Sequence, residues 1–105
     1  MDNIDIETFG DWFLVSVKKH YKNGKTFSDE EKFPLSCVYR WSQGIGFPRP
    51  SQISCIVKIF AQREYKSISD KPIKENTLVW EIVYSKVASD VMILLEREIP
   101  YEKSL

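Results

Sequence analysis

Three stretches in which apolar side chains take every second position constrain the fold of this chain most strongly. In the clearest one, residues 53–61, the alternating apolar residues are Ile53, Cys55, Val57, Ile59 and Ala61. The same period of two appears in residues 35–41 and 78–84, and a similar stretch follows at 91–99. Because successive side chains of a β-strand point to opposite faces of a sheet, this period predicts strands. The connections between the four stretches suit antiparallel pairing.

The N-terminal part of the chain has a different period. Within residues 5–23, apolar and aromatic side chains recur every three or four positions: Phe9, Trp12, Phe13, Val17, His20 and Tyr21. This spacing predicts a helix with one apolar side. Acidic residues come early in the segment and lysines late, which suits the helix dipole, and Asn23-Gly24 is a plausible C-terminal stop. Gly10 and the branched valines leave a strand over residues 12–21 as the alternative.

These elements predict a two-layer α+β fold, in which one N-terminal helix packs on a four-stranded antiparallel sheet. The length of 105 residues fits a single domain, residues 1–105, with a polar tail at about residues 100–105. Ser28-Asp-Glu-Glu31 matches the capping box that begins a helix, but Pro34 follows too soon for a long helix. We therefore expect a turn or a single helical turn there.

The predicted sheet has one face that no helix covers, and that face is not polar. It would carry Val38, Ile56, Phe60, Val79, Val83, Met92 and Leu94, with Arg40, Lys58, Glu81 and Glu96 between them. A large exposed apolar area with embedded charges is typical of a binding surface. The alternatives are a strongly curled sheet, or a cover formed by the tail or by the loop at residues 66–76.

We predict that this face contacts a protein partner through Lys58, Phe60, Glu81, Met92 and Glu96. Glu81 and Glu96 on neighbouring strands would accept a cationic group of the partner. Lys58 could instead pair with Glu81 across the sheet.

The charge balance argues against a nucleic-acid or membrane partner. The 15 basic and 15 acidic side chains give a net charge of zero, whereas such partners favour basic proteins. The lysines near the end of the predicted helix could touch phosphates, but lysines are expected at a helix C-terminus in any case. No apolar stretch is long enough to span a bilayer, and no secretory signal follows Met1. We therefore expect a cytoplasmic protein in which Cys37 and Cys55 are reduced, buried apolar residues.

The sequence has few groups for catalysis or for metal binding. His20 is the only histidine, and it has no metal-binding spacing to either cysteine. The stretch Gly44-Ile-Gly-Phe47 lacks the further glycine of a dinucleotide turn and the lysine of a phosphate-binding loop. We expect no enzymatic activity, cofactor or metal. A small hydrolase that uses His20 is the enzymatic alternative.

An aromatic N-terminal segment, Phe9-Gly-Asp-Trp-Phe-Leu-Val-Ser-Val-Lys-Lys-His-Tyr21, precedes the tryptophan-bearing alternating stretches. In size and outline the chain resembles the small immunity proteins of bacterial polymorphic and contact-dependent growth inhibition toxins. That resemblance implies an inhibitor that covers the active site of a cognate toxin, often a nuclease. The acidic residues Asp29, Glu30 and Glu31 would then supply local charge complementarity, together with Glu81 and Glu96. The alternative is a homodimeric structural or accessory domain that closes its apolar face on a second copy.

Overall fold

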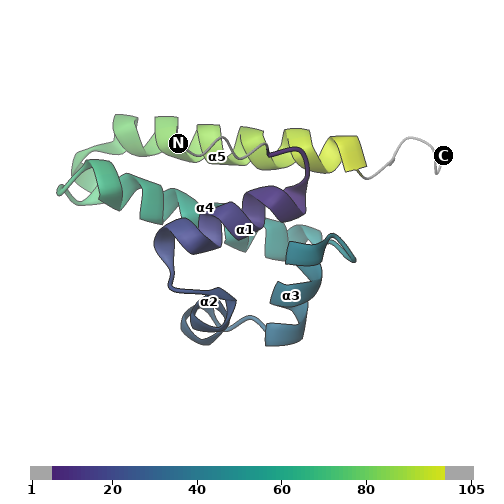
Figure 1. Cartoon of the computed structure of the whole chain (residues 1–105). Coiled ribbons are helices and arrows are strands. Elements are labelled where there is room, and N and C mark those ends of the chain that lie inside the picture. The colour runs from purple at the N-terminus through teal and green to yellow at the C-terminus, as the bar shows by residue number, and fades with distance from the viewer. Residues whose placement is uncertain (1–5, 99–105) are drawn as a thin grey trace. The chain divides into compact units, whose positions relative to one another are not determined.

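The computed structural model describes residues 6–98, and these residues form helices and no strand (Figure 1). In chain order the elements are α1 (Phe9–His20), α2 (Gly24–Glu31), α3 (Leu35–Gln43), α4 (Pro50–Ile68), the short 3-10 helix η1 (Ile73–Glu75) and α5 (Thr77–Glu98). The predicted α+β fold with a four-stranded antiparallel sheet is therefore wrong. The predicted polar tail at residues 100–105 lies outside the described residues.

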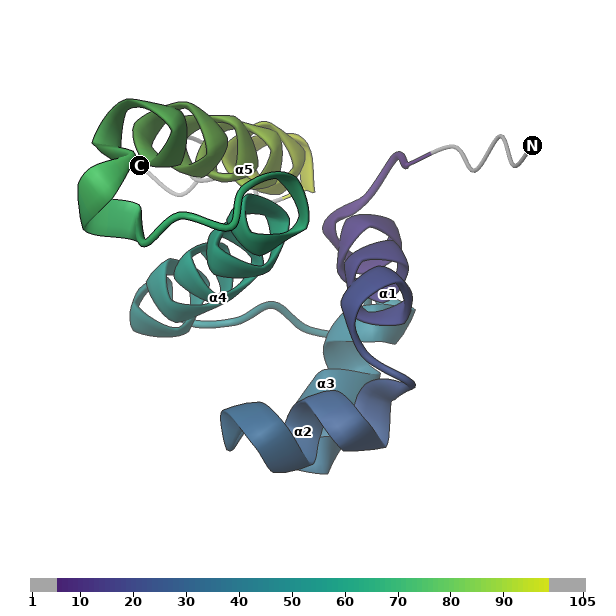
Figure 2. The ribbon, with the colours of Figure 1, turned by 90° about the vertical axis from the view of Figure 1, so that its left-hand side faces the viewer.

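The chain divides into two compact units. The first comprises Met1–Pro48 and Leu94–Leu105, and the second comprises Arg49–Ile93. Helices α1, α2 and α3 therefore belong to the first unit, whereas α4 and most of α5 belong to the second. Figure 2 shows the three short helices grouped together and α4 lying beside α5.

Helix α1 lies within the segment for which the sequence predicts a helix, and it begins with a capping box. The side chain of Thr8 accepts a hydrogen bond from the backbone N–H of Asp11 at 3.0 Å, and the Asp11 carboxylate accepts one from the N–H of Thr8 at 3.2 Å. The N–H of Phe9 donates to the carboxylate of Glu98, the last residue of α5, at 2.6 Å. These contacts satisfy backbone donors that the first turn of a helix leaves unpaired.

Helix α2 corrects the prediction for Ser28–Glu31, because these residues end a helix and do not begin one. The actual N-cap is Asn23, whose side chain accepts from the N–H of Thr26 at 2.9 Å. The hydroxyl of Ser28 donates to the carbonyl oxygen of Phe33 at 2.5 Å. Asn23 is therefore the N-cap of α2, and α1 ends before it, at His20.

Four aromatic rings pack in a closed cycle in the first unit. Phe13 meets Phe27 edge-on, with ring centroids 5.3 Å apart, and meets Trp41 edge-on at 5.8 Å. Phe33 completes the cycle, because it stacks on Phe27 at 5.6 Å and meets Trp41 at 5.7 Å. Phe13, Phe27 and Trp41 are buried and come from α1, α2 and α3, so these rings hold the three short helices together.

The second unit is organised around Tyr65 near the end of α4. Its hydroxyl donates to the carbonyl oxygens of Lys71, at 2.8 Å, and Pro72, at 3.2 Å, in the connection to α5. Its ring meets the ring of Trp80 in α5 edge-on, with centroids 6.1 Å apart. Tyr65 thus fixes both the connection and the start of the next helix.

The stretch of α4 that alternates in sequence also contains apolar residues at helical spacing. The buried residues of this helix are Ile56, Val57, Phe60, Ala61 and Tyr65. Their spacing of three and four is that of one helix side. Pro50 occupies the first position of the helix, where its fixed backbone angle and missing N–H are tolerated. Because Ile56 and Phe60, which lie between the alternating residues, are apolar as well, both periods fit the same stretch.

In α5 the period of two arises from two helical stripes. The inner stripe, Trp80, Tyr84, Val87, Val91 and Leu94, is buried or half-buried. A second stripe with the same spacing of four and three starts two residues earlier, at Leu78 and Ile82. Alternate members of the two stripes therefore fall on every second residue from Leu78 to Tyr84 and imitate a strand.

Burial also contradicts the predicted faces of the sheet. Val38, Ile56, Phe60 and Leu94 were assigned to the uncovered face, and all four are buried. By the same alternation, the predicted covered face would carry Tyr39, Ile82 and Ile93, and all three are exposed. These inversions follow from the change of period, because residues two apart share a face in a strand but point to nearly opposite sides of a helix.

Candidate protein-binding surface

Helix α5 carries exposed apolar side chains on the side opposite its inner stripe. Leu78 is 70% exposed, Ile82 61%, Met92 46% and Ile93 51%. Together with Ser85 and Ser89, these side chains define the outer stripe: Leu78, Ile82, Ser85, Ser89, Met92 and Ile93. All six residues are exposed and belong to the second unit. A helix with apolar residues on both sides is expected to be covered on both, so the outer stripe is a candidate contact surface.

The spacing of the outer stripe is that of a helix–helix seam. Positions 78, 82, 85, 89 and 92 follow the four-and-three repeat by which one helix packs along another. Large apolar side chains occupy the two ends of the seam, and the two serines occupy its middle. Small residues in the middle of a seam allow a second helix to approach closely.

A small depression lies on the flank of the outer stripe. Its lining includes Trp80, Glu81, Tyr84 and Ser85, and its volume is about 270 Å³. Trp80 and Tyr84 are half-buried, whereas Glu81 and Ser85 are exposed. We call this depression the aromatic notch.

The structure brings only some of the predicted partner-binding residues onto this surface. Met92 belongs to the outer stripe, and Glu81 lines the aromatic notch. Lys58 is exposed on α4. Phe60 is 1% exposed, so its side chain is buried and not part of an open face.

The two glutamates that were predicted to form one cation site are not neighbours. Glu81 and Glu96 are both exposed on α5, but fifteen residues separate them along one helix. At the rise of an α-helix this separation is about 22 Å. Glu96 also belongs to the first unit and Glu81 to the second. One cationic group therefore cannot contact both glutamates.

The acidic segment Asp29–Glu31 occupies the last turn of α2. Asp29 and Glu30 are exposed, and Asp29 pairs with Lys25 at 3.2 Å. Glu31 is half-buried and accepts a hydrogen bond from the hydroxyl of Tyr21 at 2.6 Å. Because a helix C-terminus disfavours negative charge, these carboxylates add little to the stability of α2 itself.

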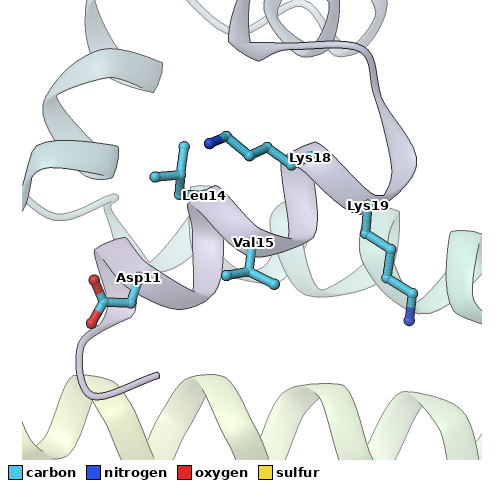
Figure 3. A pocket seen from close by; sticks show the side chains of 5 residues that line it. All are labelled: Asp11, Leu14, Val15, Lys18 and Lys19. Carbon is cyan, nitrogen blue, oxygen red and sulfur yellow. The ribbon is translucent and has the colours of Figure 1, made fainter. Parts of the chain in front are cut away.

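A wider depression of about 450 Å³ lies along α1, but its charged groups diverge (Figure 3). Its lining includes Asp11, Leu14, Val15, Lys18 and Lys19. The side chain of Lys18 extends to the same side as Leu14, whereas Lys19 extends in the opposite direction. Two ammonium groups that point apart do not form a cradle for one phosphate, so this depression does not support the phosphate contact considered for the lysines near the end of α1.

The remaining chemical groups are dispersed. Cys37 is half-buried and Cys55 exposed, so the prediction that both thiols are buried is wrong. His20 is half-buried at the end of α1. Within residues 6–98, no three His, Cys, Asp or Glu side chains are grouped in a way that could hold a metal ion. In the same residues, no helix combines the length and the apolar character needed to cross a membrane.

No family model, curated protein or solved structure matches this chain. The alternating pattern did not indicate that Leu78, Ile82, Trp80 and Tyr84 contribute to the surface. The four-and-three spacing of residues 78–92 was the signal that could have identified them, had it been tested against the period of two.

Proposed function

We propose that this chain is a non-enzymatic protein-binding domain whose contact surface is the outer stripe of α5. The observation that supports this proposal is the exposure of four large apolar side chains on one side of α5, two toward each end of the outer stripe. Water-exposed apolar side chains gain free energy when a partner covers them. Their alignment along one helix suits a partner that also presents a helix.

The size of the stripe sets the kind of complex expected. Four partly exposed apolar side chains cover on the order of a few hundred Å². A stable interface buries about 800 Å² on each partner, so the stripe would form the apolar centre of the contact. Polar side chains beside it, Glu81 and Lys86 among them, would form the rim.

Inhibition of a bacterial toxin is the specific form of this proposal. It rests on the resemblance to immunity proteins in size and in the aromatic N-terminal segment, because the predicted sheet that was also part of that resemblance is absent from residues 6–98. In that form, the partner is a cognate toxin, with a nuclease as the first candidate, and the outer stripe is the part of the chain that contacts it.

Site-specific photocrosslinking in the native host tests the proposal. A photoreactive amino acid at position 82 should give a discrete covalent adduct with one protein. The same group at position 66, an exposed lysine position in the last turn of α4, should give no such adduct. The adduct identifies the partner by mass spectrometry, and the complex is then reassembled from purified components.

The affinity of variants for the purified partner then tests whether the outer stripe is the contact surface. Ile82→Asp should weaken binding at least about tenfold, because it places a charge in the apolar centre of the contact. Lys66→Asp is the control and should leave the affinity unchanged. Circular dichroism verifies that both variants keep the helical fold. An unchanged affinity for folded Ile82→Asp would rule out the outer stripe as the contact surface.

Self-association through the same stripe is the second candidate, and the symmetry of the stripe favours it. In an antiparallel pair of α5 helices with Ser85 of one copy opposite Ser89 of the other, Ile82 of one copy would lie opposite Met92 of the other. Sedimentation of the isolated chain separates the two candidates. A dimer that Ile82→Asp dissociates supports self-association, whereas a monomer at all concentrations supports a different partner.

A further inference from the structure

The aromatic notch is held in shape by contacts behind it. The rings of Trp80 and Tyr84 lie with centroids 5.6 Å apart and a tilt of 55°. Behind them, the ring of Tyr65 meets Trp80 edge-on, and the Tyr65 hydroxyl is anchored to the backbone at Lys71. The two rings that line the notch are therefore ordered before any ligand arrives, which lowers the entropic cost of binding.

Glu81 gives the notch a negative charge. Its carboxylate is exposed, and within residues 6–98 it forms no ion pair. The helix neighbours one turn away, Leu78 and Ser85, carry no charge. The nearest lysine along the helix, Lys86, is paired with Asp90 at 3.1 Å. The charge of Glu81 is thus available to a ligand.

The size of the notch limits what it can hold. Sites for whole small molecules have volumes of about 300–1,000 Å³, and the notch, at about 270 Å³, is smaller. It is large enough for the head group of one side chain. Aromatic faces together with a carboxylate attract a cation, because the face of each ring carries partial negative charge.

We propose that the aromatic notch binds the guanidinium group of an arginine on a protein partner. A guanidinium is planar and stacks on an aromatic ring while its N–H groups donate to a carboxylate. A lysine ammonium pairs with the carboxylate but is more strongly hydrated and does not stack. This proposal rests on the proposed function, because the notch shares Ser85 with the outer stripe and would contact the same partner.

A titration with short peptides tests the notch without the natural partner. The probes are hexaarginine, hexalysine and hexacitrulline peptides with blocked ends, since citrulline keeps the shape of arginine but lacks its charge. The readout is the NMR signal of each tryptophan indole N–H, and the Trp80 signal is assigned from its loss in Trp80→Phe. Trp12 and Trp41 are buried and serve as internal references.

Hexaarginine should shift the Trp80 signal in a saturable way and leave the signals of Trp12 and Trp41 unchanged. Hexalysine should bind about fivefold more weakly, and hexacitrulline should cause no saturable shift. Glu81→Gln should weaken hexaarginine binding about fivefold, whereas Glu96→Gln, which removes an exposed carboxylate elsewhere on α5, should not.

Two results would overturn the proposal. One is an equal response of Trp80 to hexaarginine and hexalysine, and the other is an equal loss of binding in Glu81→Gln and Glu96→Gln. Either would indicate unspecific attraction of a polycation. Ile82→Ser separates this failure from that of the proposed function, because it removes an apolar side chain of the outer stripe without adding a charge beside Glu81. This variant should bind hexaarginine like the wild type even where it loses the protein partner.

Discussion

Gly10 in α1 and Trp41 in α3 approach each other so closely that no side chain fits between them. A Cβ atom on Gly10 would lie 2.8 Å from the backbone carbonyl oxygen of Trp41 and 3.1 Å from that of Ser42. Both atoms belong to the backbone and cannot rotate away. The absence of a side chain at Gly10 therefore allows α1 to pack on α3.

Gly10→Ala should lower the free energy of unfolding by about 1–3 kcal/mol, because backbone must shift to admit the methyl group. The sign is informative, since alanine normally stabilises a helix interior by about 1 kcal/mol relative to glycine. Gly24→Ala is the matched control: its Cβ would lie 3.4 Å from the nearest atom, a methyl carbon of Val38. Urea unfolding should show a loss for the first variant only, and equal midpoints would contradict the close approach.

Thr8→Ala should cost about 0.5–2 kcal/mol, because the Asp11 N–H loses its partner in the capping box. Ser51→Ala is the comparison, since Ser51 is exposed in the first turn of α4. The midpoint of thermal unfolding, measured by circular dichroism, should fall for Thr8→Ala and stay nearly constant for Ser51→Ala. If both variants unfold at the same midpoint temperature as the wild type, the capping box does not stabilise α1.

Phe60→Ala and Met92→Ala should lower the free energy of unfolding by very different amounts, although the alternating pattern predicts both residues on one open face. Phe60 is buried, so its truncation should cost about 3–5 kcal/mol. Met92 is partly exposed, and its truncation should change stability by about 0.5 kcal/mol or less. Denaturant unfolding of the two variants measures the difference. Similar losses would place Phe60 at the surface and contradict the packing of α4.

The two thiols should react at different rates under native conditions. Cys55 is exposed and should be modified first by a thiol reagent, whereas the half-buried Cys37 should react more slowly. Cys55→Ser should remove the fast phase and leave the slow one. In denaturant both thiols should react together. Two equal rates in the native protein would contradict the different burial of these residues.

The first helix could be predicted from the sequence because its apolar and aromatic residues recur at helical spacing over residues 9–21, whereas the strand alternative covers residues 12–21 only. Phe9, Phe13 and Val17 recur at spacings of four. Gly10 lies inside the helix and does not break it, and the close approach of Trp41 explains why this position is a glycine. The predicted segment began at residue 5, whereas the capping box of Thr8 and Asp11 sets the observed start of the helix at Phe9. Local signals and packing agree in this segment.

The later helices could not be assigned by alternation because their residues satisfy two periods at once. In α5, Leu78 and Trp80 belong to different stripes of one helix, yet they are two residues apart, as neighbours on a strand face are. The many β-branched residues of this segment also favour strands locally. Packing of the inner stripe overrides that local preference.

The candidate surface was only partly predictable for the same reason. The sequence does indicate that the chain has more apolar residues than one buried face requires, and the outer stripe is where that excess lies. The assignment of Met92 to an exposed position survives the change of fold, whereas that of Phe60 does not. Which apolar residues are exposed depends on whether the chain follows the helical or the strand period. The alternating residues fit both periods, so the sequence pattern did not decide between them.

The hydroxyl of Tyr65 also restricts how the length of the chain can vary during evolution or engineering. Surface connections usually accept insertions, but an extra residue between Ser69 and Lys71 would displace the carbonyl groups that this hydroxyl binds. The connection between α4 and α5 should therefore keep its length. An epitope or reporter sequence is better placed after Ile45, which is exposed beyond the end of α3.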